Sequence, residues 1–157
     1  MLRARRGSRG ARTAVNYDLV RIDRLVYVQL LRAPTVASLR ALRDELTSAR
    51  QEAGQLLIHV AEIPVDAEPV PPEMRGHLAA HGKYVSTLCE QVHLVIEAPG
   101  FRGAILRSAI TATALLTRER NLTVHARLAD AIDIARRGLG REWAAEVDAL
   151  LDHATAA

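Results

Sequence analysis

The sequence predicts an α/β fold, with a single sheet of about five strands, an N-terminal β-hairpin and helices packed on the sheet. Two observations support this prediction. Short runs rich in branched apolar residues alternate with longer segments in which apolar residues recur every three or four positions. This alternation of strand and helix patterns is typical of α/β sheets. Residues 55–62, QLLIHVAE, also form a near-continuous apolar run, which predicts a central strand covered on both faces.

Composition limits the classes of protein that the chain can represent. With 157 residues, 49% of them hydrophobic, it is long enough to bury one core. Aromatic residues make up only 3%, which disfavours the stacking platforms that bind single-stranded nucleic acid. The single cysteine, Cys89, excludes an internal disulfide and agrees with a reducing compartment. We find no apolar run near the roughly 18 residues of a membrane span and no secretory signal, so we expect a soluble cytoplasmic protein.

Positive charge is concentrated in an N-terminal arm, residues 1–14, which precedes the predicted domain at 15–139. Its first 12 residues contain five arginines and no acidic residue. They are Arg3, Arg5, Arg6, Arg9 and Arg12. Without these five, the 21 basic residues fall to 16 against 18 acidic ones, so the body is mildly acidic. The arm is either a passive, disordered tail or an electrostatic tether to an acidic partner, nucleic acid or anionic lipid.

The first half of the domain is expected to begin with a hairpin formed by the runs YDLVRID and LVYVQLL. A helix should follow, with Thr35 as its N-cap and Gly54 at its end. The apolar positions of this helix recur every three or four residues. They are Val36, Leu39, Leu42, Leu46 and Ala49.

After the central strand, a second helix is expected to start at Pro72, because proline suits the first helical position. Its apolar stripe has a 4-3-4-3-4 spacing, with a histidine among the apolar residues. The stripe comprises Met74, Leu78, His81, Val85, Leu88 and Val92. Residues 93–98, HLVIEA, should form the next strand, which ends at Pro99 and Gly100.

The pattern of residues 101–120 predicts a helix that is apolar around much of its circumference. We expect such a helix to be buried on more than one side, either by the C-terminal segment or by a second subunit. A strand at 121–127 and a helix broken near Gly138 and Gly140 follow. Residues 140–157 predict an extra C-terminal helix, packed on the domain or on a partner subunit. Its apolar face comprises Trp143, Val147, Leu150 and Leu151.

In its order of elements, the chain resembles the STAS domains of anti-sigma-factor antagonists from about Tyr17 to Leu139. The similar segments are the hairpin, VASLRALRDEL, QLLIHVAE, HLVIEA, the helix through Arg118 and NLTVHARLADAIDIARRGL. The resemblance implies a non-catalytic regulatory module in signalling, which binds a protein partner or a small ligand through the loop after the central strand. Switching members carry a phosphorylated Ser or Thr there, in a motif such as DS-x-G. This chain has neither residue type between His59 and Ser86, so that switch is not available to it.

The loop after the central strand is the predicted binding site. Four prolines stiffen it and lower the entropy lost when a partner docks, and its acidic side chains favour a basic partner. The predicted partner-binding residues are Asp66, Glu68, Pro71, Glu73 and Arg75. Alternatively, the loop is a surface crossover made stiff for stability alone.

Signals for chemistry are weak. The sequence has no P-loop, Rossmann glycine motif, nucleophile elbow or C-x-x-C motif, so we expect neither a cofactor nor catalysis. Glu73, His77 and His81 have the i, i+4, i+8 spacing of weak metal-ligand candidates, but a half-buried core histidine is the simpler interpretation of His81. His59 and His125 lie in predicted strands and either face each other across the sheet or are structural.

Two further possibilities remain open at the level of sequence. One is a small-molecule or lipid carrier with a pocket beside the apolar helix at 101–116. The other is a homodimer, because that helix and the Trp143 segment offer more apolar surface than one layer needs to cover.

Overall fold

The computed structural model describes residues 16–64, 70–116 and 121–156, without the side chains of 109–116. It confirms the predicted fold class, because five strands form one sheet in the order β1-β2-β3-β4-β5. The strands are β1 (Tyr17–Ile22), β2 (Leu25–Leu30), β3 (Leu57–Ile63), β4 (Cys89–Ile96) and β5 (Leu122–His125). The predicted central strand, β3, occupies the middle of the sheet and pairs in parallel with β2 and β4.

The N-terminal hairpin consists of β1 and β2, which pair antiparallel from Tyr17 opposite Leu30 to Ile22 opposite Leu25. The turn between them contains two residues, Asp23 and Arg24, and Asp23 adopts a positive φ of 50°. Aspartate tolerates this conformation better than most residues, which explains why the turn forms without glycine. The strand order places β1 at one edge of the sheet.

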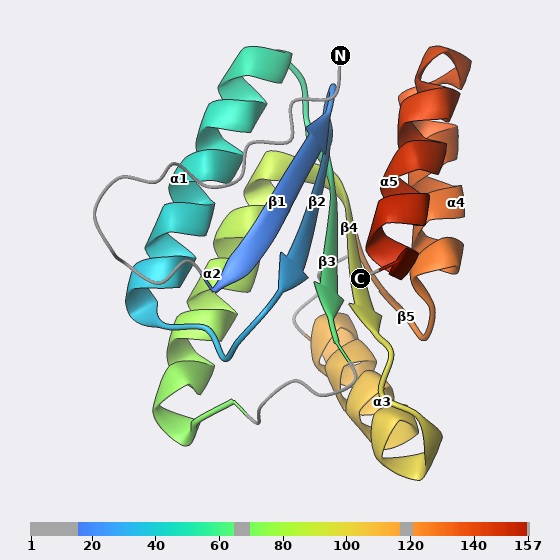
Figure 1. Cartoon of the computed structure of the whole chain (residues 1–157). Helices are drawn as coiled ribbons and strands as arrows, with labels where there is room; N and C mark the ends of the chain where they lie inside the picture. Colours follow the sequence, from blue (N-terminus) through green and yellow to red (C-terminus); the bar gives the residue numbers. More distant parts are fainter. Residues whose placement is uncertain (1–15, 65–69, 117–120, 157) are drawn as a thin grey trace.

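Helices cover both faces of the sheet (Figure 1). α1 (Val36–Ala53) and α2 (Arg75–Leu88) lie on one face, and α4 (Leu128–Leu139) and α5 (Ala144–Ala156) lie on the other. Two short 3₁₀ turns, η1 (Pro72–Met74) and η2 (Arg141–Trp143), precede α2 and α5. Each face has its own core. Leu42 and Leu46 pack in the core on the α1–α2 face, and Ile58, Ile132 and Val147 pack in the core on the α4–α5 face.

α1 begins and ends where the sequence predicts. The hydroxyl of Thr35 accepts a hydrogen bond from the Ser38 amide, and the Ser38 hydroxyl accepts one from the Thr35 amide, which completes a capping box. Gly54 closes the helix at a φ of 67°.

Thr35→Ala removes the hydroxyl of this capping box. We expect it to lower the free energy of unfolding by about 1 kcal/mol, because one amide of the first turn loses its acceptor. Urea denaturation followed by Trp143 fluorescence measures the change. Thr155→Ala, in the last turn of α5, is the control and should have a smaller effect; equal effects would contradict the capping role.

The boundary between the second helix and the following strand differs from the prediction. α2 ends at Leu88 and β4 begins at once with Cys89, whereas the apolar stripe predicted a helix through Val92. In β4, Val92 pairs with His59 of β3 and packs on the α1–α2 face beside Leu88. The helical spacing continued into the strand because both elements turn apolar residues toward the same core.

The C-terminal region packs onto the domain. α4 ends at Leu139, between Gly138 and Gly140, near which the break was predicted, and Gly140 adopts a φ of 109°. Gly138 lies so close to β3 that a Cβ there would be 2.8 Å from Cδ1 of Ile58. α5 packs on α4 and β1, and Val147 and Leu150 are buried in the core. α5 therefore covers the sheet.

Candidate partner-binding site

The carboxyl ends of β3 and β4 lie at the same end of the sheet, where α/β proteins usually contact ligands and partners. β3 leads through the proline-containing loop to η1 and α2. β4 leads to α3 (Gly100–Leu116). Figure 1 shows α3 below this end of the sheet and not on either face.

The predicted binding loop is only partly described. Asp66 and Glu68 fall in 65–69, outside the described residues. Pro71 precedes η1, and its carbonyl accepts a hydrogen bond from the Met74 amide, while the Met74 side chain is buried. Glu73 and Arg75 are exposed. The described end of the loop is thus anchored by Met74 and presents two charged side chains to solvent.

Close backbone contact attaches α3 to the end of β4. Gly100 starts the helix at a φ of 71°. At Gly103, a Cβ would lie 1.9 Å from the carbonyl oxygen of Ala98, so only glycine fits at this position. The Arg107 side chain donates hydrogen bonds to the carbonyls of Ile96 (2.9 Å) and Ala98 (3.1 Å). Gly103 and Arg107 therefore fix the direction in which α3 leaves the sheet.

The first two turns of α3 expose large apolar side chains. Phe101 is 80% exposed, Ile105 53% and Leu106 44%. The helix packs mainly against β5. The expectation that the C-terminal segment buries this helix is wrong for these residues, because they are exposed and α3 packs mainly against β5. Burial by a second subunit stays a prediction. A Leu or Phe side chain on a helix carries no signal of whether another element of the same chain will cover it.

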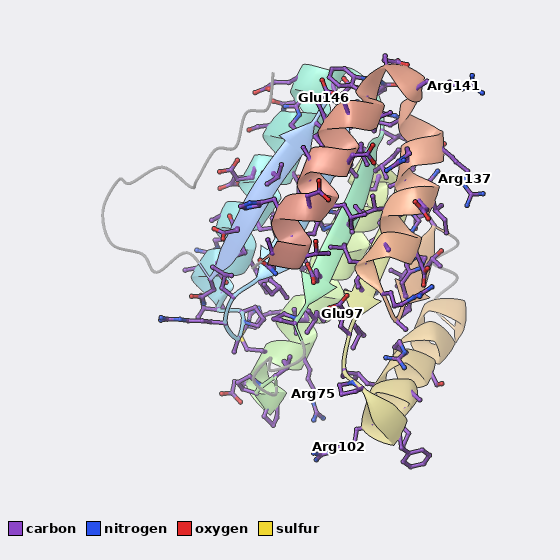
Figure 2. All side chains as sticks on the ribbon, turned by 45° about the vertical axis from the view of Figure 1, so that its right-hand side comes forward. Arg75, Glu97, Arg102, Arg137, Arg141 and Glu146 are labelled. Carbon is purple, nitrogen blue, oxygen red and sulfur yellow. The ribbon has the colours of Figure 1, made fainter. Side chains whose placement is uncertain are left out.

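Arginines accompany this apolar surface. Arg102 and Arg75 are both exposed, and Figure 2 shows them at the same end of the molecule as α3. Phe101, Ile105 and Leu106, with Arg102, form what we call the α3 surface. Its three apolar residues are spaced i, i+4 and i+5, so they lie along one side of the helix. An exposed apolar group of this kind is typical of an interaction site.

A polar group that the sequence analysis missed lies inside the molecule, on the α4–α5 face. The Tyr27 hydroxyl donates a hydrogen bond to the carboxylate of Glu62, which is 5% exposed. Burial raises the pKa of Glu62, and nearby Glu97 raises it further, against the opposing effect of the Tyr27 bond. Glu97 accepts a hydrogen bond from the Leu128 amide at the start of α4. These contacts connect the sheet to α4 and leave Glu62 enclosed.

Of the two alternatives for His59 and His125, the structure supports the structural one and not contact between them across the sheet. His125 contacts His93, at 3.0 Å between Nε2 of His125 and Nδ1 of His93, and not His59. With Nε2–H of His93 donating to Gln91 Oε1, Nδ1 of His93 accepts from His125. Burial lowers the pKa of His93 to about 4, with a smaller contribution from the charge of His125. Nδ1–H of His59 donates to the Val26 carbonyl, and burial lowers the His59 pKa to about 4.

The weak metal candidates do not form a site. Among the residues in the described ranges, no group of three His, Cys, Asp or Glu side chains could hold a metal ion. Glu73 and His77 are exposed, while His81 is half-buried. Burial lowers the pKa of His81 to about 4, with a smaller contribution from the charge of Arg43 on α1.

Cys89 is 3% exposed and lies in β4 against the α1–α2 core. Burial raises the pKa of its thiol to about 12, so the nucleophilic thiolate is rare at neutral pH. Phe101, Ile105 and Leu106 face solvent and thus do not line an enclosed pocket of the kind a carrier would need.

Comparison with known proteins finds no matching family model, no significant match among curated proteins and none among solved structures. The resemblance to STAS domains therefore stays a prediction. Within the described residues, no helix combines the length and apolar character needed to cross a membrane.

Proposed function

We propose that this chain is a non-catalytic regulatory module of STAS type, which acts in the cytoplasm by binding a partner protein at the carboxyl end of its sheet. The observation that carries the proposal is the exposed α3 surface. Phe101, Ile105 and Leu106 leave apolar area in water at the end of the sheet where partners usually bind.

The spacing of these residues indicates how a partner would contact them. Apolar anchors along one side of a helix suit the recognition mode in which a helix is received by an apolar groove. Exposed Arg102 and Arg75 favour acidic residues at the rim of that groove. The partner is thus a protein with an apolar groove that has acidic residues at its edge. Asp66, Glu68 and Glu73 would add contacts to basic groups beyond the rim.

Two features favour a protein partner over a carried ligand. The α3 surface is convex and exposed, whereas small molecules bind in concave sites that bury most of the ligand. The backbone of α3 is held by Gly103 and Arg107, so the helix keeps its direction and loses little entropy when a partner binds.

Photo-crosslinking in the native cell tests the proposal. With p-benzoylphenylalanine in place of Phe101, we expect covalent capture of one protein other than this chain. Ile105→Ser/Leu106→Ser should weaken this capture by about 100-fold, the effect of losing two anchors worth roughly 1.4 kcal/mol each.

Leu56→Ser is the matched control, because Leu56 is 40% exposed, close to the 44% of Leu106, and lies before β3 at the opposite end of the sheet. It should leave capture unchanged. Capture of a second copy of this chain would instead support the homodimer and contradict the proposed partner. Equal losses in both variants would show that binding does not depend on α3.

A further inference from the structure

An open groove lies between β1 and α1, at the edge of the sheet away from α3. Leu19 and Val26 form its floor on the sheet, and Ala41 and Ala49 contribute from α1. Its volume is about 470 Å³, within the range of roughly 300–1,000 Å³ that is typical of ligand sites.

The rim of this groove is acidic. Asp44, Glu45 and Glu52 line it together with Ser48, and all four are exposed. Glu52 pairs with Arg21 of β1 at 2.5 Å. In the described part of the chain, Asp44 and Glu45 form no ion pair. The groove therefore has two uncompensated carboxylates above an apolar floor.

β1 adds an open edge to the groove. It pairs with β2 on one side, and no described strand pairs with its other side, so alternate backbone amides and carbonyls on that side are available to an added strand. A segment that pairs with this edge would place alternate side chains over the groove, where the carboxylates favour basic groups.

We propose that residues 1–12 of the chain's own N-terminal arm occupy this groove along β1. The arm contains five arginines and no acidic residue, which complements the groove. It is joined to the domain through Asn16, whose backbone oxygen accepts hydrogen bonds from the amides of Leu31 and Arg32. Burial of Tyr17, the next residue, raises its pKa to about 12, and the charges of Glu45 and Asp44 contribute to the increase.

Length and tethering favour the chain's own arm over a separate basic peptide. Twelve extended residues span about 40 Å, and the six residues of β1 span about 20 Å, so the arm is long enough to turn back and run along the strand. Because the arm is attached beside the groove, its effective concentration there is in the millimolar range, well above that of a partner segment in trans.

Trypsin cleavage of the full-length chain tests this contact, because trypsin cuts after arginine. At low salt, the arm of Asp44→Asn/Glu45→Gln should be cleaved roughly fivefold faster than the wild-type arm, because loss of the two charges releases it. The difference should disappear at high salt, which screens exposed charges. Asp133→Asn/Asp152→Asn, on α4 and α5, is the matched control and should behave like the wild type.

Equal arm cleavage in the groove variant and in the wild type at low salt would overturn the proposal. A second measurement reports where the arm binds. Ser8→Cys/Ser48→Cys should form an intrachain disulfide under mild oxidation, with native Cys89 buried. Disulfide-linked dimers in place of the intrachain product would mean that the arm binds a second copy, and they would overturn binding within one chain.

Discussion

Lowering the pH from 7 to 4 is expected to reduce the free energy of unfolding by about 3 kcal/mol through His59 alone. Burial holds the folded pKa of His59 at about 4, against an ordinary value of 6.5. The folded state therefore favours the neutral ring. This contribution is fully present above pH 6.5 and is lost progressively as the pH falls from 6.5 through 4.

Other buried groups modify the acid dependence. The pKa of His93 is also lowered to about 4, so its contribution is lost in the same range. Glu62 acts in the opposite direction, because its raised pKa favours the protonated carboxyl in the folded state at acidic pH. The net loss is thus smaller than the sum of the histidine contributions.

His59→Gln isolates the contribution of the His59 ring to the pH dependence of stability. The glutamine side-chain amide can still donate to the Val26 carbonyl but does not titrate. Urea denaturation at several pH values should give a shallower loss of stability for this variant than for the wild type. His77→Gln, at an exposed position, is the control for the substitution. A wild-type slope retained in His59→Gln would contradict the assignment.

Gly103→Ala is expected to lower the free energy of unfolding by about 1–3 kcal/mol, the usual cost of overpacking. The new Cβ would lie 1.9 Å from the Ala98 carbonyl oxygen, so the first turn of α3 must move. The bonds from Arg107 to the Ile96 and Ala98 carbonyls should then weaken. Urea denaturation measures the loss, and photo-crosslinking at position 101 measures its effect on partner binding.

Gly82→Ala provides the control of opposite sign. Gly82 lies inside α2, and a Cβ there would meet no atom within 4 Å. We expect this substitution to stabilise the chain by about 0.5–1 kcal/mol, because alanine has the higher helix propensity. If both alanine variants were stabilised, the close contact between α3 and β4 would be refuted.

Where the fold was predictable, local signals agreed with the tertiary structure. Thr35 and Gly54 mark the ends of α1 because a cap depends only on the neighbouring backbone. β3 was recognisable as the central strand because both of its faces are buried and its apolar run is nearly continuous. The helical spacing from Leu88 to Val92 wrongly predicted a longer α2, since Val92 lies in β4 and packs on the same core as α2.

The candidate site was less predictable, because exposure and side-chain pairing depend on the assembled fold. Apolar composition alone could not distinguish a buried α3 from an exposed one. The pairing of His93 with His125 follows from the parallel register of β4 and β5, in which Val95 lies opposite His125. Because side chains alternate along a strand, the sequence indicates that His93 and Val95 share a face of β4. It does not indicate which strand lies beside β4. The Tyr27–Glu62 bond likewise required the β2–β3 register.

The exposure of α3 in the isolated chain is best measured with a single tryptophan at its first turn. In Trp143→Phe/Phe101→Trp, the indole is the only one in the chain, because the sequence has one Trp. We predict emission typical of an indole in water and full access to acrylamide at every protein concentration. Blue-shifted emission that is shielded from acrylamide, even in dilute solution, would mean that α3 is covered by its own chain and would contradict its role as a partner-binding helix.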